Sequence, residues 1–105
     1  MIKSLIIKFA MFTETQNVFI EYSNGAITKV PISMNDLPKF IANSRCEKVY
    51  AYGLVPFTKK FEAEVRNKYN NTDIVWYYND RKKSAEIIEK HYKEKKKSEL
   101  SDKND

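Results

Sequence analysis

The sequence predicts a single α/β domain with a five-stranded mixed sheet, in which three strands are followed by helix, strand, helix, strand and helix. Three observations support this fold class. Residues 48–78 read as strand, helix and strand, Asn24-Gly25 separates two runs of β-forming residues, and 105 residues suit one domain. A hairpin-rich first half followed by crossover units implies a sheet that is antiparallel at first and parallel later.

The first half of the chain reads as three strands, at residues 5–12, 18–22 and 26–32. The first run is apolar except for Lys8, which indicates a strand buried on both faces. Asn24-Gly25 favours positive φ angles and predicts a tight type I′ turn in a hairpin. Pro31 has no amide donor, so it confines the end of the third strand to a sheet edge or exit.

The second half of the chain alternates helices and strands. The strands are expected at residues 48–55 and 73–78, where β-branched and aromatic residues dominate. Between them an apolar residue recurs every four positions, which predicts an amphipathic helix with Thr58 as N-cap; these residues are Phe57, Phe61, Val65 and Tyr69. A shorter helix is expected at residues 36–44, after the capping oxygens of Asn35 and Asp36 and with Pro38 in its first turn.

The last helix begins after the capping residues Asn79 and Asp80. Its apolar stripe is predicted to hold Ala85, Ile88 and Tyr92, with Ile87 and His91 beside them. The sequence therefore predicts a globular domain over residues 1–92. Residues 93–105 are predicted to be a charged helix end, extending by a turn or two, and a disordered tail.

The chain is basic, with a formal charge of +5 and a pI near 9.2. Residues 1–80 carry a net +2 and residues 81–105 a net +3, so the excess is densest at the C-terminus. Such a balance favours polyanions such as nucleic acid, although a solvated charged helix explains it equally well. Charges at Lys3 and Lys8 interrupt the apolar start, so we expect a cytoplasmic protein with no membrane partner.

Residues that carry chemistry are scarce. Cys46 is the single cysteine and His91 the single histidine, which excludes an internal disulfide and the usual zinc sites. His91 lies beside an apolar stripe, which favours a structural role, and Cys46 has no histidine near it in sequence. The two glycines are too far apart for a phosphate-binding loop. We therefore predict no catalytic residue, no metal and no cofactor.

This succession of elements resembles the ribonuclease H-like fold along nearly the whole chain, by topology and with no shared motif. Nucleases of that fold hold two magnesium ions with clustered carboxylates, one of them in the middle of the first strand. The predicted first strand has no acid, and neither does the Tyr52-Gly53 region that corresponds to the end of the family's fourth strand. The resemblance therefore implies a catalytically inert scaffold.

Aromatic residues next to cations give the one positive indication of function. Stacking rings beside a basic helix make a platform for bases and phosphates; the residues expected to bind are Trp76, Tyr77, Tyr78, Arg81, Lys82, Lys83 and Lys90. The leading hypothesis is a small non-enzymatic nucleic-acid-binding accessory protein, for DNA more than RNA, of the kind encoded by mobile genetic elements. The competing interpretation places most of the rings in the core. The alternative function is a protein-interaction module, as a homodimer or as an inhibitor of a larger enzyme.

Overall fold

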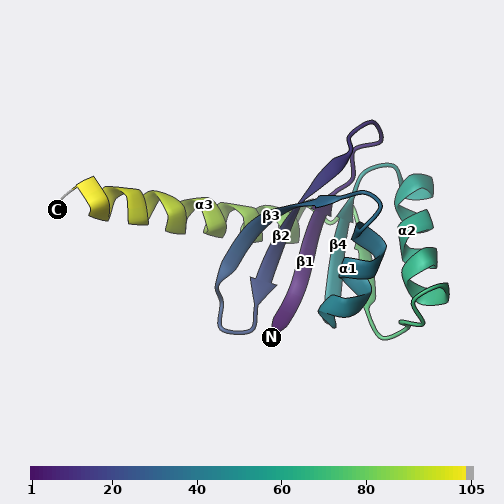
Figure 1. Cartoon of the computed structure of the whole chain (residues 1–105). Coiled ribbons are helices and arrows are strands. Elements are labelled where there is room, and N and C mark those ends of the chain that lie inside the picture. The colour runs from purple at the N-terminus through teal and green to yellow at the C-terminus, as the bar shows by residue number, and fades with distance from the viewer. Residues whose placement is uncertain (104–105) are drawn as a thin grey trace.

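A computed structural model describes residues 1–103 and the side chains of residues 1–93. It confirms a single α/β domain with a five-stranded mixed sheet and three helices (Figure 1). The elements are, in chain order, β1 (Ile2–Lys8), β2 (Thr15–Tyr22), β3 (Ile27–Ser33), α1 (Leu37–Ser44), β4 (Lys48–Tyr52), α2 (Val55–Asn67), β5 (Val75–Tyr78) and α3 (Arg81–Lys103).

The strands lie in the order β3-β2-β1-β4-β5. β1, β2 and β3 pair antiparallel, whereas β1 pairs with β4 and β4 with β5 in parallel. The sheet therefore changes from antiparallel to parallel at β1, its central strand. α1, which connects β3 to β4, and α2, which connects β4 to β5, pack on one face of the sheet, and α3 lies against the other (Figure 1).

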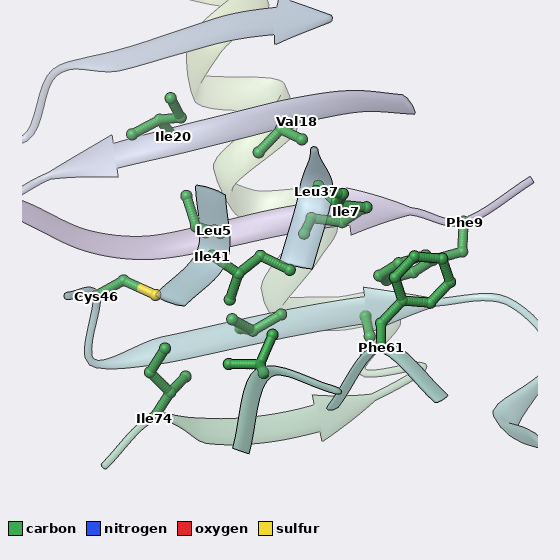
Figure 2. Packing of buried hydrophobic residues seen from close by; sticks show 13 residues of the cluster. Leu5, Ile7, Phe9, Val18, Ile20, Leu37, Ile41, Cys46, Phe61 and Ile74 are labelled. Atoms are coloured by element: carbon green, nitrogen blue, oxygen red, sulfur yellow. The ribbon is translucent and has the colours of Figure 1, made fainter. Parts of the chain in front are cut away.

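The main core lies between the sheet and the pair α1 and α2 (Figure 2). Alternate residues of β1 and β2 point into it, as the two-residue period of a strand requires. Its buried members are Leu5, Ile7, Phe9, Val18, Ile20, Leu37, Ile41, Cys46, Val49, Ala51, Phe61, Val65 and Ile74. This single contiguous cluster unites strands and helices from residue 5 to residue 74, which explains why the chain folds as one domain.

The face beneath α3 is covered only in part. A small cluster of Ile6, Ile27, Tyr50 and Ile87 joins the helix to the sheet. Beyond this contact α3 projects past the β3 edge of the sheet (Figure 1). The second face of the sheet therefore stays partly open to solvent, and this opening makes room for a surface site.

The buried stripe of α3 differs from the predicted one. Ala85 is exposed, whereas Ser84 is completely buried and donates its hydroxyl to the Asp80 carbonyl oxygen at 2.9 Å. The stripe that faces the sheet consists of Ser84, Ile87, Ile88 and His91. Ser84 can lie closest to the sheet because it is small and its hydroxyl is satisfied by a hydrogen bond within its own helix. Asp80 caps the helix as predicted, since its carboxylate accepts from the Lys83 amide at 3.2 Å.

α3 continues to Lys103, further than the turn or two expected after Lys93. The last two residues of the expected disordered tail lie outside the described residues, and the division of the chain at residue 92 stays a prediction. No helix among residues 1–103 is long and apolar enough to cross a membrane.

Two predicted boundaries were wrong at the carboxyl ends of β1 and β4. β1 ends at Lys8; Phe9 still packs into the main core, but Met11 and Phe12 turn outward, with Phe12 97% exposed. α2 begins at Val55, three residues before the predicted N-cap, because Pro56 needs no amide partner in the first helical turn. Thr58 lies inside the helix, fully buried, and donates its hydroxyl to the Val55 carbonyl oxygen.

Gly53 ends β4 in a conformation with φ of +134°, which side chains other than glycine rarely adopt. A Cβ atom at this position would stand 3.0 Å from the carbonyl oxygen of Phe9. The amide side chain of Asn79 bonds both backbone groups of Gly53, at 3.0 Å and 3.1 Å. These contacts hold the ends of β1, β4 and β5 close together.

The β2–β3 hairpin is present, but its turn is not type I′. Gly25 has a positive φ of 91°, whereas Asn24 has not, so only one of the two required residues adopts that conformation. The Gly25 amide donates to the Tyr22 carbonyl oxygen, and the Tyr22 amide donates to that of Ala26. The connection is a three-residue loop that ends in a left-handed glycine, the common alternative to the two-residue turn. At the start of α1, Asp36 is the N-cap residue as predicted, but its carboxylate accepts from the Ser33 hydroxyl and makes no cap bond to the helix backbone.

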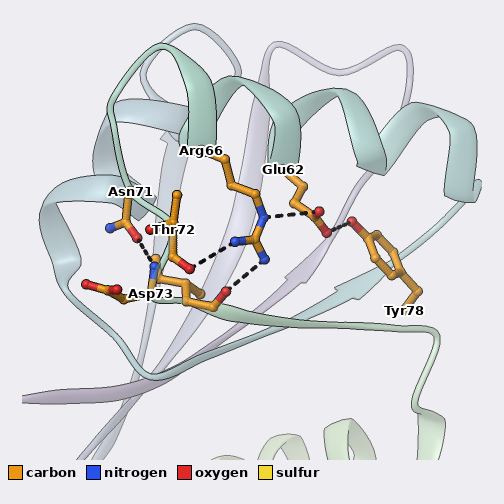
Figure 3. Close-up of polar contacts among 7 residues, drawn as sticks. Glu62, Arg66, Asn71, Thr72, Asp73 and Tyr78 are labelled. Carbon is orange, nitrogen blue, oxygen red and sulfur yellow. Dashed lines mark hydrogen bonds and ion pairs between the residues drawn. The ribbon is translucent and has the colours of Figure 1, made fainter.

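A polar network fastens α2 to β5 and the segment before it (Figure 3). The Arg66 guanidinium donates to the carbonyl oxygens of Thr72 and Ile74, at 3.1 Å and 3.0 Å, and forms an ion pair with Glu62. Glu62 also accepts the hydroxyl of Tyr78. Burial and this hydrogen bond to a carboxylate raise the pKa of Tyr78 well above its usual range.

Candidate nucleic-acid interface

The open part of the second sheet face is hollowed on the side of α3. Two hollows of about 350 Å³ and 260 Å³ adjoin there and share Lys8 and Phe19. We call them together the α3 groove; it is lined by Ile6, Lys8, Ala10, Thr13, Thr15, Gln16, Asn17, Phe19, Lys29, Tyr52, Ile88 and Tyr92. The groove reaches the ends of β1 and β4, and ligands of open α/β sheets commonly bind beyond the carboxyl ends of parallel strands.

Strand register puts the cations and rings of the groove on one face. Lys29 pairs with Phe19, and Phe19 pairs with Ile6, so these three side chains form a row across β3, β2 and β1. Lys8 follows Ile6 by two residues and therefore shares its face. Its parallel partner is Tyr52. A lysine and a tyrosine thus end the two central parallel strands side by side.

The aromatic side chains are held by contacts with one another and with Lys29. The Lys29 Nζ atom lies 5.8 Å from the centre of the Phe19 ring. Edge contacts join the Phe19 ring to those of His91, at 5.5 Å between centroids, and Tyr92, at 6.3 Å. The His91 Nδ1 atom lies 3.2 Å from the Ile27 carbonyl oxygen, which fixes the helix over the sheet. Tyr92 remains 48% exposed, so about half of this residue stays accessible to a ligand.

One mouth of the groove is built by the loop between β1 and β2. Gln16 is almost fully buried and closes this loop by donating to the Ala10 carbonyl oxygen at 2.7 Å and accepting from the Ala10 amide at 3.1 Å. Its amide group also donates to the Thr13 hydroxyl. The loop is therefore anchored at both of the positions that it contributes to the lining.

The electrostatic character of the groove is cationic. Lys8 and Lys29 are both exposed, and none of the described residues that line the groove is acidic. Glu21, on the same face of β2, accepts a 2.5 Å hydrogen bond from the buried hydroxyl of Ser4 and lies outside the lining. A surface with two cations and no opposing carboxylate attracts anionic ligands.

The three consecutive aromatics predicted to bind divide between the two faces of the sheet. Trp76 and Tyr78 stack with centroids 6.4 Å apart on the face of α2, where both pack against the main core. The Trp76 Nε1 atom is buried and has no hydrogen-bond partner in the described structure. Tyr77 lies on the opposite face, 38% exposed and stacked on Tyr50 at 5.2 Å. Burial and the neighbouring Tyr77 raise the pKa of the Tyr50 phenol.

The predicted cations are exposed but lie outside the α3 groove. Arg81, Lys82 and Lys83 occupy the first turn of α3, where Lys83 is 4.0 Å from Glu86. The Lys90 Nζ atom donates to the carbonyl oxygen of Gly25, which ties the helix to the β2–β3 hairpin. Tyr77 and the first turn of α3 therefore lie apart from the groove, and the binding role of the seven predicted residues stays a prediction.

Sequence reasoning missed Lys8, Phe19, Lys29, Tyr52 and Tyr92 as a group. Each belongs to a different strand or helix, and only the pairing register brings them together. One signal was available. Lys8 interrupts an otherwise apolar run, and the two-residue period places such a residue on a single, solvent-facing side of the strand.

The single cysteine and the single histidine are withdrawn from solvent, the cysteine almost fully and the histidine in part. Cys46 is 4% exposed, and its burial raises the pKa of the thiol. His91 is partly buried and occupied by its contacts with Ile27 and Phe19. Within the described residues, no group of three or more histidine, cysteine, aspartate and glutamate side chains could hold a metal ion.

Comparisons with known protein families, with curated proteins and with solved structures each find no match.

Proposed function

We propose that this protein is a small non-enzymatic accessory protein that binds nucleic acid, DNA more than RNA, through the α3 groove. The observation that supports this proposal is the joint presence of Lys8 and Lys29 with three rings in an open groove whose described lining contains no acid. Lysines neutralise phosphates, and aromatic rings stack on bases. A net charge of +5 adds a long-range attraction to any polyanion.

We further propose that the scaffold is ribonuclease H-like in topology and catalytically inert. The succession of elements and the change from antiparallel to parallel pairing support the resemblance. In nucleases of that fold, carboxylates on the first strand and at the end of the fourth hold the metal ions. Here the apolar Leu5 stands in the middle of β1, and Lys8 and Tyr52 stand at the ends of β1 and β4. The lysine ammonium repels a metal ion and attracts a phosphate group, which favours binding without cleavage. We also propose that it is an accessory protein of the kind that mobile genetic elements encode.

Salt dependence of DNA binding tests the function and the site together. Two lysines that each neutralise one phosphate of a single strand give a slope of log K against log salt of about −1.4, which is a loss of about sevenfold between 50 and 200 mM. Fluorescence anisotropy with labelled single- and double-stranded DNA measures this slope. Absence of binding, or binding that does not weaken with salt, would refute the proposal.

A pair of double variants locates the interface. Lys8→Gln with Lys29→Gln should abolish most of the salt dependence, because both predicted phosphate contacts are removed. The matched control, Lys82→Gln with Lys83→Gln, removes the same charge from exposed positions of α3 and should leave the slope unchanged. If the salt dependence of binding disappears in the control variant and persists in the groove variant, binding occurs at the residues predicted from the sequence.

Exposed apolar side chains at the end of the sheet favour a second candidate, a protein-interaction module. Phe12 is 97%, Leu54 63% and Met11 48% exposed. Met11 and Leu54 line a hollow of about 250 Å³ with Pro56, Phe57 and Lys60. Apolar surface of this kind is common at protein interfaces. Light scattering tests this candidate, which predicts a mass above the 12.4 kDa of one chain and no salt-sensitive affinity for DNA.

A further inference from the structure

We infer that the α3 groove takes a single nucleic-acid strand, with bases stacked on Tyr92 and Tyr52 and phosphates on Lys8 and Lys29; this inference rests on the function proposed above. The first argument is the accessibility of the rings. Phe19 and Tyr52 are half-buried in the groove, and Tyr92 stands at its side on α3. Bases of a duplex stack on one another and cannot present their faces to recessed rings, whereas unpaired bases can.

The second argument is the alternation of cations and rings. Lys8 borders both hollows, with Phe19 beside it and Tyr52 at its paired position on β4. Lys29 borders the hollow that also contains Tyr92. A single strand presents phosphates and unstacked bases in alternation, and each hollow offers at least one lysine and one ring. Both DNA and RNA strands provide this chemistry, and the experiment has an arm for each.

The third argument is the number of cations. The described lining holds two lysines. A duplex carries twice as many phosphates per length as one strand, so two cations match a single strand better than a duplex. Binding of a duplex along α3 by the four cations predicted from the sequence would give a steeper slope, about −3.6. The groove, with two lysines and several rings, suits a ligand held by stacking and by few phosphate contacts, which tolerates varied base sequence and gives the shallower slope of about −1.4.

The test compares labelled thymidine and uridine strands of about 15 nucleotides with the duplexes that they form with complementary strands. The variants are Tyr92→Ser and the matched control Tyr77→Ser, another exposed tyrosine of the same sheet side that lies outside the groove. We expect either single strand to bind about tenfold more tightly than its duplex. Tyr92→Ser should weaken strand binding at least about fivefold, the lower end of a lost stacking contact, and Tyr92→Phe should restore it.

The outcomes separate the inference from the proposed function. A duplex that binds as tightly as the strand, with a slope that still depends on Lys8 and Lys29, overturns the inference and leaves the proposed function intact. Equal losses for the Tyr92 and Tyr77 variants also overturn it. Absence of salt-sensitive binding to every ligand overturns both. Thermal unfolding of each variant shows whether a lost affinity reflects a lost fold; if Tyr92→Ser unfolds, Tyr92→Leu provides the same test with the apolar packing retained.

Discussion

Replacing Gly53 by alanine should destabilise the protein more than the same change at its other glycine. Both glycines have positive φ, +134° at Gly53 and +91° at Gly25, so both substitutions strain the backbone. They differ in what the new methyl group meets. At Gly53 it would approach the Phe9 carbonyl oxygen to 3.0 Å, whereas at Gly25 it would meet only the flexible end of Lys90 at 3.4 Å.

The difference between the two substitutions isolates the cost of the close contact. Backbone strain alone costs about 1–3 kcal/mol at either position. Crowding against the Phe9 backbone, which is fixed by its amide bond to the Tyr52 carbonyl oxygen at 2.8 Å, adds about 1–3 kcal/mol for Gly53→Ala. In a domain of this size, each kcal/mol lowers the melting temperature by about 4–8 °C.

Urea unfolding of the two variants, followed by circular dichroism, measures both free energies. We expect Gly53→Ala to lose at least about 1 kcal/mol more than Gly25→Ala, with the same m-value. Equal losses in the two variants would show that the ends of β1 and β4 can move apart at no cost, and the argument from close approach would be wrong.

Three further predictions concern the polar network, alkaline pH and the core. Arg66→Met should lower the free energy of unfolding by about 1–3 kcal/mol in the same urea experiment, because it removes two hydrogen bonds to carbonyl oxygens. Lys68→Met breaks the exposed ion pair with Glu64 and should lower it by less than about 1 kcal/mol. Because the pKa of Tyr78 is raised in the folded protein, its stabilising contribution is complete below pH about 10 and is lost as the pH rises further. The melting temperature should therefore fall above pH about 10, and that of Tyr78→Phe should fall less steeply. Ile41→Ala, at a completely buried position, should lower the free energy of unfolding measured by calorimetry by about 2–5 kcal/mol. Leu54→Ala, at an exposed position, should change it by close to zero, and similar values for both variants would contradict the assigned core.

The architecture could be predicted from the sequence because its signals are local. Alternating β-forming runs, Asn24-Gly25 and the four-residue spacing of Phe57, Phe61 and Val65 each depend on neighbours in the chain. Boundaries were less accurate where tertiary contacts decide them. The apolar residues after Lys8 read as strand, yet the chain leaves the sheet after Phe9, whose amide still donates to the Tyr52 carbonyl oxygen, and Met11 and Phe12 turn outward.

The candidate site could not be predicted, because it depends on register and on which face α3 covers. Strand alternation places Tyr77 on the opposite face from Trp76 and Tyr78, but the sequence alone does not say which side meets the basic helix. In the structure two of the three rings that were expected beside the cations, Trp76 and Tyr78, pack toward α2. Lys8 and Lys29 are 21 positions apart and become neighbours of one groove only through the pairing of β1, β2 and β3.

The projection of α3 past the sheet affects how the size of this protein is judged in solution. The molecule measures 51 × 29 × 25 Å, and its radius of gyration is 14.6 Å, compared with about 13 Å for a compact sphere-like chain of equal length. An elongated monomer tumbles slowly and elutes early from a sizing column. Its apparent hydrodynamic radius will therefore imitate that of a larger species, and an early elution peak by itself will say nothing about self-association.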